Sequence, residues 1–333
     1  MIQVTLFIAG DDTKRLEIER NLSELQGEFP HQLHIIDIQK DPVLTHAFED
    51  KAPVLDVGLF RFIKSFDKEE IKYAISKADE RLKEAKLKGN ETMVRHITQP
   101  VKMTGADRFS HWFSKHYMFM LNGFVFLYLF LAVLAPIFMK VGWDRPAKVI
   151  YKVYSPLCHQ LAFRSFFLFG EQPYYPRELA GVEGMITYGQ ATGLDENDLQ
   201  DARNFLGNET LGYKMALCQR DIAIYGAIFI FGLIFSLTGK KMKPLPWYLW
   251  IIIGLGPIGL DGFSQLLSQT GLGIFNWLNL RESTPFLRSM TGLFFGLATA
   301  WFGYPYLEES VQENRNEMAL KYAIVKQMSK EKV

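Results

Sequence analysis

The chain has 333 residues, two cysteines and a formal net charge of +1. This length is enough for two domains. The near-neutral charge gives no electrostatic reason to expect nucleic acid as a partner. The N-terminal part is polar and charged, whereas long apolar runs rich in Phe, Leu, Ile and Gly follow from residue 117. The composition therefore predicts a soluble domain followed by a multi-pass α-helical membrane domain.

The N-terminal part alternates between strand-like and helix-like segments. Residues 2–10 combine β-branched and aromatic side chains, which favours a strand. Residues 11–29 carry an apolar stripe at helical spacing, which favours a helix. The next segments are predicted as a strand (32–39), a short helix (41–50), a hairpin (52–58 with 60–66) and a helix (67–89). The predicted order is β-α-β-α-β-β-α.

This order resembles the thioredoxin fold, and in particular small glutaredoxin-like proteins, over a domain of residues 1–88. Ala52-Pro53, at the start of the third predicted strand, matches the position of the cis-proline in that family. The redox Cys-X-X-Cys would follow the first strand, where this chain has AGDDTKR (9–15) instead. Without cysteines the domain cannot carry out thiol–disulfide exchange. Two roles remain open: a module that docks a protein partner or regulates, and an inherited scaffold without activity.

Four apolar runs are long enough to cross a membrane, which takes about 20 mostly apolar residues. They are residues 117–139, 222–239, 246–267 and 286–307. Residues 89–116 are predicted to form a linker that approaches the membrane interface, and the membrane domain to span 117–307 in contact with the lipid bilayer. The last segment, 308–333, is predicted to be a polar, solvated helical tail.

Lysine and arginine near the ends of the apolar runs predict the orientation. Lys102, Arg108 and Lys115 precede the first run, and Lys240, Lys241 and Lys243 lie between the second and the third. With four crossings these two regions and the basic C-terminal tail lie on one face. We expect that face to be cytoplasmic, with both termini on it.

The two cysteines would then lie together on the outer side. Cys158 is followed by His159, and Cys218 precedes Asp221 by three residues, at the start of the second apolar run. Two sulfurs, an imidazole nitrogen and a carboxylate oxygen form a donor set that suits Zn²⁺. An outer-face disulfide and two unrelated structural cysteines are the alternatives that the spacing leaves open.

Residues 154–296 resemble a family of prokaryotic membrane proteins known as domain of unknown function 2085. The resemblance is carried by LCHQLAFRSF, CQRDIAIYG, PIGLDGFSQLL and RESTPFLRSMTGLFFG, in this order. The positions that match the family pattern are Cys158, His159, Arg164, Cys218, Arg220, Asp261, Gln265, Arg288 and Gly292. The resemblance implies a location in the prokaryotic inner or plasma membrane and implies no known activity.

The chain departs from the family at Asp221, which stands where the family has a further cysteine. Aspartate can replace cysteine as a zinc ligand, so the resemblance favours a zinc site at Cys158, His159, Cys218 and Asp221. The alternative is that the metal was lost and Cys158 pairs with Cys218 in a disulfide. In that case the protein is a non-catalytic subunit or docking component of a membrane complex.

Charged residues inside apolar segments are costly and indicate function. Asp261 lies in the third run and Arg288 at the start of the fourth. We expect these two residues to pair and to serve acid–base or anion-binding roles, and thus to be the catalytic candidates; a pair that only fixes two helices is the alternative. Gln265 is one helical turn from Asp261 and would share its face. Arg164 either extends its charge toward lipid phosphates, which we favour, or lies buried in the polar cluster. The remaining members of the predicted outer polar cluster are Arg220 and Arg281.

Overall fold

A computed structural model describes residues 1–10, 13–64, 66–270 and 279–330. The chain forms two compact units, one made of Met1–Lys115 with Val311–Val333 and the other of His116–Ser310. We call them the N-terminal unit and the membrane unit and describe each by itself. The four-part division expected from the sequence, with boundaries at 88, 116 and 307, stays a prediction.

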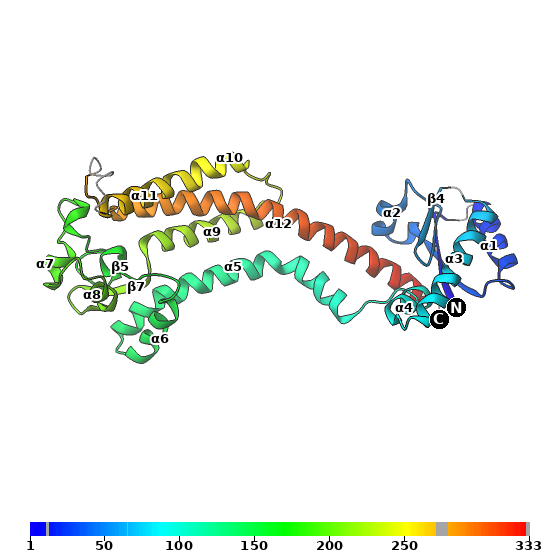
Figure 1. Cartoon of the computed structure of the whole chain (residues 1–333), viewed down its shortest axis with the longest axis horizontal. Helices are drawn as coiled ribbons and strands as arrows, with labels where there is room; N and C mark the ends of the chain where they lie inside the picture. Colours follow the sequence, from blue (N-terminus) through cyan, green and yellow to red (C-terminus); the bar gives the residue numbers. More distant parts are fainter. Residues whose placement is uncertain (11–12, 65, 271–278, 331–333) are drawn as a thin grey trace. The chain divides into compact units, whose positions relative to one another are not determined.

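The N-terminal unit contains the predicted α/β region (Figure 1). Its elements are β1 (Ile2–Ile8), α1 (Thr13–Leu25), β2 (His31–Asp37), η1 (Ile38–Lys40), α2 (Pro42–Phe48), β3 (Val54–Val57), β4 (Phe60–Ile63), α3 (Lys68–Leu87) and α4 (Glu91–Thr98). The helices and strands follow the expected order, with η1 and α4 added. Asp11 and Asp12, in the stretch that replaces the redox motif, lie outside the described residues.

The four strands form one sheet in the order β2-β1-β3-β4. β1 is parallel to β2 and antiparallel to β3, and β3 and β4 form the predicted antiparallel hairpin. The strands are rich in β-branched and aromatic residues, which pack well on a pleated surface. The Ala52–Pro53 peptide bond before β3 is cis, as predicted.

The helices of this unit begin and pack for local reasons. Asp67 caps α3 by accepting a hydrogen bond from the Glu70 backbone N–H at 2.8 Å, while the Glu70 carboxylate accepts from the Asp67 N–H at 3.0 Å. This reciprocal capping satisfies two backbone donors that a helix start leaves free. On the inner face of α3, Ile71 and Ile75 are fully buried against the sheet core.

The C-terminal tail differs from the prediction of a solvated helix. It is the end of α12 (Pro285–Lys330), a continuous helix of 46 residues. Ala323 and Met328 are buried in a core cluster with Phe7 and Ile36 of the sheet. Gln327 Nε2 also donates to the Asp37 carbonyl at 2.9 Å. Apolar residues at helical spacing on this tail therefore cover one part of the sheet of the N-terminal unit.

The membrane unit consists of long helices and a smaller region of short elements (Figure 1). Its elements are the main part of α5 (Gly105–Lys140), then α6 (Asp144–Tyr154), η2 (Ala162–Arg164), β5 (Ser165–Leu168), η3 (Glu178–Ala180), α7 (Tyr188–Thr192), α8 (Leu199–Asn204), β6 (Gly207–Asn208), β7 (Gly212–Cys218), α9 (Gln219–Leu237), α10 (Trp247–Leu249), η4 (Trp250–Leu255), α11 (Gly256–Gln269) and the first part of α12.

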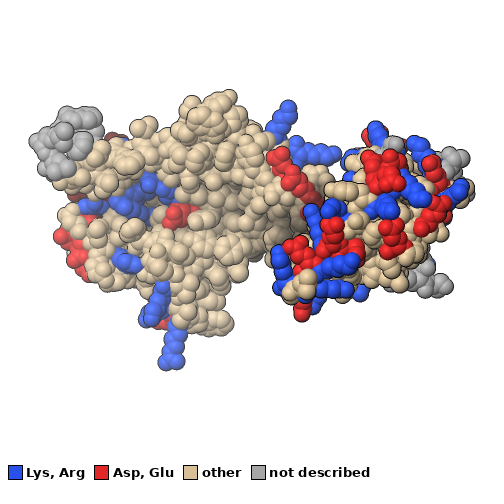
Figure 2. Space-filling model, turned by 45° about the vertical axis from the view of Figure 1, so that its right-hand side comes forward, with Lys and Arg blue, Asp and Glu red and all other residues tan. Residues whose placement is uncertain are grey.

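Three helical stretches of the described chain are long and apolar enough to cross a membrane: Gly105–Lys140, Gln219–Leu237 and Trp247–Gln269. They overlap the first three predicted crossings almost completely. The fourth, 286–307, lies inside α12, which does not meet the same criteria, so four crossings stay a prediction. In Figure 2 much of the surface of the membrane unit is uncharged, whereas the N-terminal unit carries many charged side chains.

The third stretch is irregular before Asp261. Trp250–Leu255 form a π-helical segment, which is followed by Pro257 at the start of α11. Such segments are rare inside helices and occur often beside functional sites. This one precedes Asp261 by less than two helical turns.

Helices α9 and α12 approach each other closely at two glycines. A Cβ placed on Gly292 would lie 2.6 Å from the Arg220 carbonyl oxygen, and one on Gly296 would lie 2.3 Å from the Ile224 carbonyl oxygen. Glycines four residues apart let two helix backbones come together, as in membrane helix pairs generally. The contact at Gly292 places Arg220 against the helix that carries Arg288.

Candidate functional site

The two cysteines and Asp221 come together, as the sequence predicts. The Sγ atoms of Cys158 and Cys218 and a carboxylate oxygen of Asp221 all lie within 4.8 Å of one another. Both cysteines are free. Cys218 Sγ donates to Asp221 Oδ2 at 3.1 Å, and the Cys218 backbone N–H donates to Cys158 Sγ at 3.3 Å. We call these three residues the thiol–carboxylate group.

The turn from strand to helix explains this geometry. β7 ends at Cys218, which is the N-cap of α9 with extended backbone angles. Asp221 is in the first turn of α9, three residues later, and so shares a face with Cys218. Cys158 follows α6 and packs in a core cluster with Tyr154 and Ala216.

The two thiols titrate as a pair. The hydrogen bond with Cys218, together with burial, raises the pKa of Cys158, whereas the hydrogen bond with Cys158 lowers the pKa of Cys218 against the opposing effect of burial. Cys218 is therefore the thiol that ionises first. The start of a helix is also the place where backbone N–H groups stabilise a thiolate.

The donor set fits a zinc-like ion. In a tetrahedral site with Zn–S near 2.3 Å and Zn–O near 2.0 Å, ligand atoms lie roughly 3.5 to 3.8 Å apart. The thiol–carboxylate group is within about 1 Å of that spacing. His159, the fourth predicted ligand, is exposed and outside the group. The structure therefore does not bring His159 to the other three predicted ligands, and its role as a ligand stays a prediction.

A second polar cluster surrounds two buried carboxylates. Asp261, in α11, is 4 % exposed. Its Oδ1 accepts from Arg281 Nη2 at 2.8 Å, and its Oδ2 accepts from Ser283 Oγ at 2.7 Å and from Arg220. One donor on α9 and two donors in the segment before α12 therefore hold this carboxylate in place.

Glu282, in the segment before α12, is the second carboxylate, and it is 5 % exposed. Arg164 binds it through two nitrogens at 2.9 and 3.2 Å, and Arg288 donates to Oε1. Arg177 Nη1 donates to Oε2 at 3.4 Å, and Gln265 Nε2 donates to the same oxygen at 3.1 Å.

Opposing effects act on the ionisation of Glu282. Burial raises the pKa of Glu282, but the positive charges of Arg164, Arg288 and Arg177 outweigh burial and lower the pKa below its usual range. The carboxylate is therefore ionised at neutral pH. Gln265 links it to the other carboxylate, because its Oε1 accepts from the Ser283 backbone N–H at 3.4 Å. We call the five arginines and two acids the arginine cluster.

Two expectations about this cluster are corrected by the structure. Asp261 and Arg288 do not pair: Asp261 pairs with Arg220 and Arg281, and Arg288 pairs with Glu282. Arg164 does not extend to lipid phosphates but forms a two-point ion pair with Glu282. The two parallel hydrogen bonds from Arg164 to Glu282 match the planar geometry in which a guanidinium binds a carboxylate most strongly.

Two members of the cluster escaped the sequence analysis. Glu282 stands beside Arg281 in the RESTPFLR motif, so a carboxylate just before an apolar run was an available signal. Arg177 lies in the long connection after β5, where nothing in the sequence separates it from a solvated arginine. The predicted Arg164, Arg220 and Arg281 belong to the cluster, and the predicted Gln265 donates a hydrogen bond to its Glu282.

Lys214, in β7, is a further buried charge-bearing residue near the thiols, with 0 % exposure. Its Nζ donates to the Gln160 carbonyl at 2.7 Å and to the Arg203 carbonyl at 2.6 Å. Burial lowers the pKa of Lys214 to about 7. A neutral amine has two N–H groups, which matches the two carbonyl acceptors.

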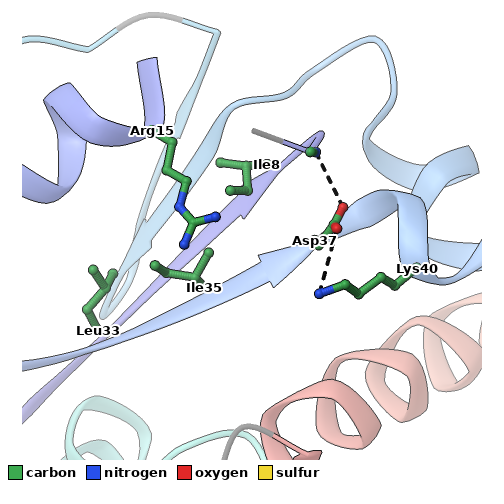
Figure 3. Close-up of a pocket in the computed structure, with 7 residues that line it drawn as sticks. Ile8, Arg15, Leu33, Ile35, Asp37 and Lys40 are labelled. Atoms are coloured by element: carbon green, nitrogen blue, oxygen red, sulfur yellow. Dashed lines mark hydrogen bonds and ion pairs between the residues drawn. The ribbon is translucent and has the colours of Figure 1, made fainter. Parts of the chain in front are cut away.

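The N-terminal unit has a pocket of about 520 Å³ at the carboxyl ends of β1 and β2. Figure 3 shows Arg15, Asp37 and Lys40 around it, with Asp37 Oδ1 3.4 Å from the Gly10 N–H and Oδ2 3.8 Å from Lys40 Nζ. The described residues that line it include neither cysteine nor histidine.

Comparisons with known proteins agree with a membrane protein of unassigned activity. The chain is 28 % identical over 207 residues to "Uncharacterized protein MJ1492" of Methanocaldococcus jannaschii, which covers 60 % of this chain and 96 % of that protein. No solved structure matches the chain. Residues 200–302, which include Cys218, Asp221, Asp261 and Arg288, match the family described as "Predicted membrane protein (DUF2085)".

Proposed function

We propose that this chain is an integral membrane protein of the DUF2085 family whose membrane unit binds a zinc-like divalent ion through Cys158, Cys218 and Asp221. The observation that carries the proposal is the approach of these three ligand atoms to within 4.8 Å of one another. Nothing in local sequence forces this approach, since Cys158 lies 60 residues before Cys218.

The surroundings support a metal thiolate site. The Cys218 backbone N–H that points at Cys158 Sγ would stabilise a thiolate, as second-shell donors do at metal sites. Three protein ligands leave a fourth coordination position, which water or a substrate fills in catalytic zinc sites. A bound ion would act there as a Lewis acid and would activate a water in its fourth position. The three residues of this chain would hold and orient the ion.

The metal content of the purified full-length protein tests the proposal. We expect about one zinc per chain, and its loss in Cys158→Ser, Cys218→Ser and Asp221→Asn. His159→Ala is the matched control and should keep the metal, because His159 is exposed and outside the group. Wild-type protein without metal, with thiols that react with maleimide only after reduction, would replace the proposal with the disulfide and docking role.

The finer fold assignment also belongs to this proposal. The sheet order β2-β1-β3-β4 and the cis Ala52–Pro53 bond support a thioredoxin-like fold for the N-terminal unit. Both cysteines of the chain lie outside it, so its role would be to dock a protein partner.

The orientation with both termini cytoplasmic requires 286–307 to be a fourth crossing. The three lysines between α9 and α10 support it, because basic residues favour the cytoplasmic side. Labelling of Cys218 from the cytoplasmic side of intact vesicles would reverse this placement.

A further inference from the structure

The arginine cluster carries more positive charge than its own acids neutralise. Its cations are Arg164, Arg177, Arg220, Arg281 and Arg288. Among the described residues, the acids that form ion pairs with these arginines are Asp261 and Glu282, so five guanidinium groups face two carboxylates and a charge of +3 is left over. Buried charges are normally paired, so this excess indicates that the cluster holds an additional anion.

The two carboxylates have little capacity left for these charges. A carboxylate offers about four lone-pair sites, and Glu282 already accepts from three arginines and two glutamine side chains. Asp261 accepts from two arginines and a serine, which leaves about one site. The acids of the cluster therefore cannot supply an acceptor for every remaining guanidinium donor.

Donors remain for such oxygens. Arg177 Nε and Arg220 Nε are buried and have no hydrogen-bond partner in the described part of the chain. A buried guanidinium N–H without an acceptor is costly. Arginine is the residue best suited to bind phosphate, because its planar fork donates two parallel hydrogen bonds.

The cluster can be reached from outside the protein. The side chains of Arg164 and Arg281 are 30 % and 35 % exposed, whereas that of Arg288 is 4 % exposed. The cluster thus has a buried base and an accessible rim. The guanidinium groups of Arg164 and Arg177 lie 5.6 and 5.2 Å from the centre of the Phe163 ring, which fixes their orientation without using their donors.

We propose that the arginine cluster is a binding site for a phosphate group. Its elements place it at the end of the candidate membrane helices, because Arg220 is in the first turn of α9 and Arg288 in the first turn of α12. The phosphate is therefore either the headgroup phosphate of a membrane lipid or a free phosphate ion. The site shares no ligand atom with the thiol–carboxylate group and does not depend on the metal.

The test uses the full-length protein in a phosphate-free detergent. The first arm measures the unfolding temperature and the binding isotherm in potassium phosphate against potassium chloride at equal ionic strength. The second arm measures binding of dioleoyl phosphatidic acid against dioleoylglycerol, which has the same acyl chains and no phosphate. Binding in the first arm identifies free phosphate, and binding only in the second identifies a lipid headgroup.

The variants Arg177→Gln and Arg220→Gln should each weaken binding by about ten-fold or more, since each removes a charge-assisted donor. Each variant leaves the neighbouring carboxylate with other arginine partners, which favours folding. Arg145→Gln, an exposed arginine of α6, is the matched control and should bind like the wild type. Wild-type protein that binds neither probe, or variants that bind as well as the control, would overturn the proposal; zinc content measured on the same samples reports separately on the metal site.

Discussion

The start of α9 presents two different kinds of polar chemistry to its two sides. Cys218 and Asp221 meet Cys158 in a core cluster with residues of α5 and α6. Arg220, turned about 200° from Cys218 by the helical repeat, meets Asp261 of α11 instead. The thiol–carboxylate group has few hydrogen-bond donors that lack an acceptor, whereas the arginine cluster has more positive than negative charges. The comparison teaches that a four-residue motif can supply two separate sites, each completed by a different part of the chain.

The largest effect is expected for a substitution that disrupts only the arginine cluster. Glu282→Gln keeps the size of the side chain but leaves three guanidinium groups without their carboxylate. We expect a loss of about 3 to 5 kcal/mol in the free energy of unfolding, because removing one member of a buried ion pair leaves the other charged and buried. Thermal unfolding in detergent measures this. Zinc content should not change.

The matched control is Glu183→Gln in the same unit, at an exposed position. It should change stability by less than about 0.5 kcal/mol. A Glu282→Gln protein as stable as this control would show that Glu282 does not balance the arginines. The lowered pKa of Glu282 gives a further sign: its stabilising contribution is present above the ordinary value of 4.5 and is lost as the pH falls through the lower, folded-state pKa.

A smaller effect is expected where α12 packs on α9. In Gly296→Ala the new Cβ would lie 2.3 Å from the Ile224 carbonyl oxygen and 2.9 Å from Ala227 Cβ. The helices must move apart, and we expect a loss of about 1 to 3 kcal/mol in the free energy of unfolding. The unfolding temperature measures this effect.

Gly303→Ala on the same helix is the control for Gly296→Ala, because a Cβ there has no atom within 4 Å. It should leave stability equal or slightly higher, since alanine favours a helix over glycine by about 1 kcal/mol. Equal effects of the two variants would mean that the close contact of α9 and α12 does not hold the arginine side together.

The smallest expected effect concerns the thiol side and is a dependence on pH. Because burial lowers the pKa of Lys214 to about 7, the unfolded chain binds more protons than the folded chain between pH 7 and the ordinary lysine value. Stability therefore rises with pH across this window, by at most about 1.4 kcal/mol per pH unit. Lys214→Met removes this dependence.

The difference in unfolding temperature between wild type and Lys214→Met, measured from pH 7 to 9, isolates this group from the others that titrate there. We expect the difference to grow with pH in favour of the wild type. A constant difference would show that Lys214 stays charged in the folded protein.

Much of the candidate site could be predicted from residue type and spacing. Cys158, Cys218 and Asp221 were expected together because the chain has only two cysteines and one helical turn joins Cys218 to Asp221. His159 lies outside the group, because adjacency in sequence does not bring two side chains to one point. Glu282 and Arg177 were missed because their importance comes from burial, which a polar residue in a connecting segment does not reveal.

The sequence by itself determined the order of strands and helices in the N-terminal unit, the cis-proline position and three apolar helices, because these follow from local patterns of residue type. Only the tertiary structure decided which charges pair. Asp261 forms ion pairs with Arg220 and Arg281 rather than with Arg288, and Arg288 forms an ion pair with Glu282. Ion pairs depend on distances of a few ångströms between side chains on different elements, and those distances are set by the packing of the helices rather than by any one segment.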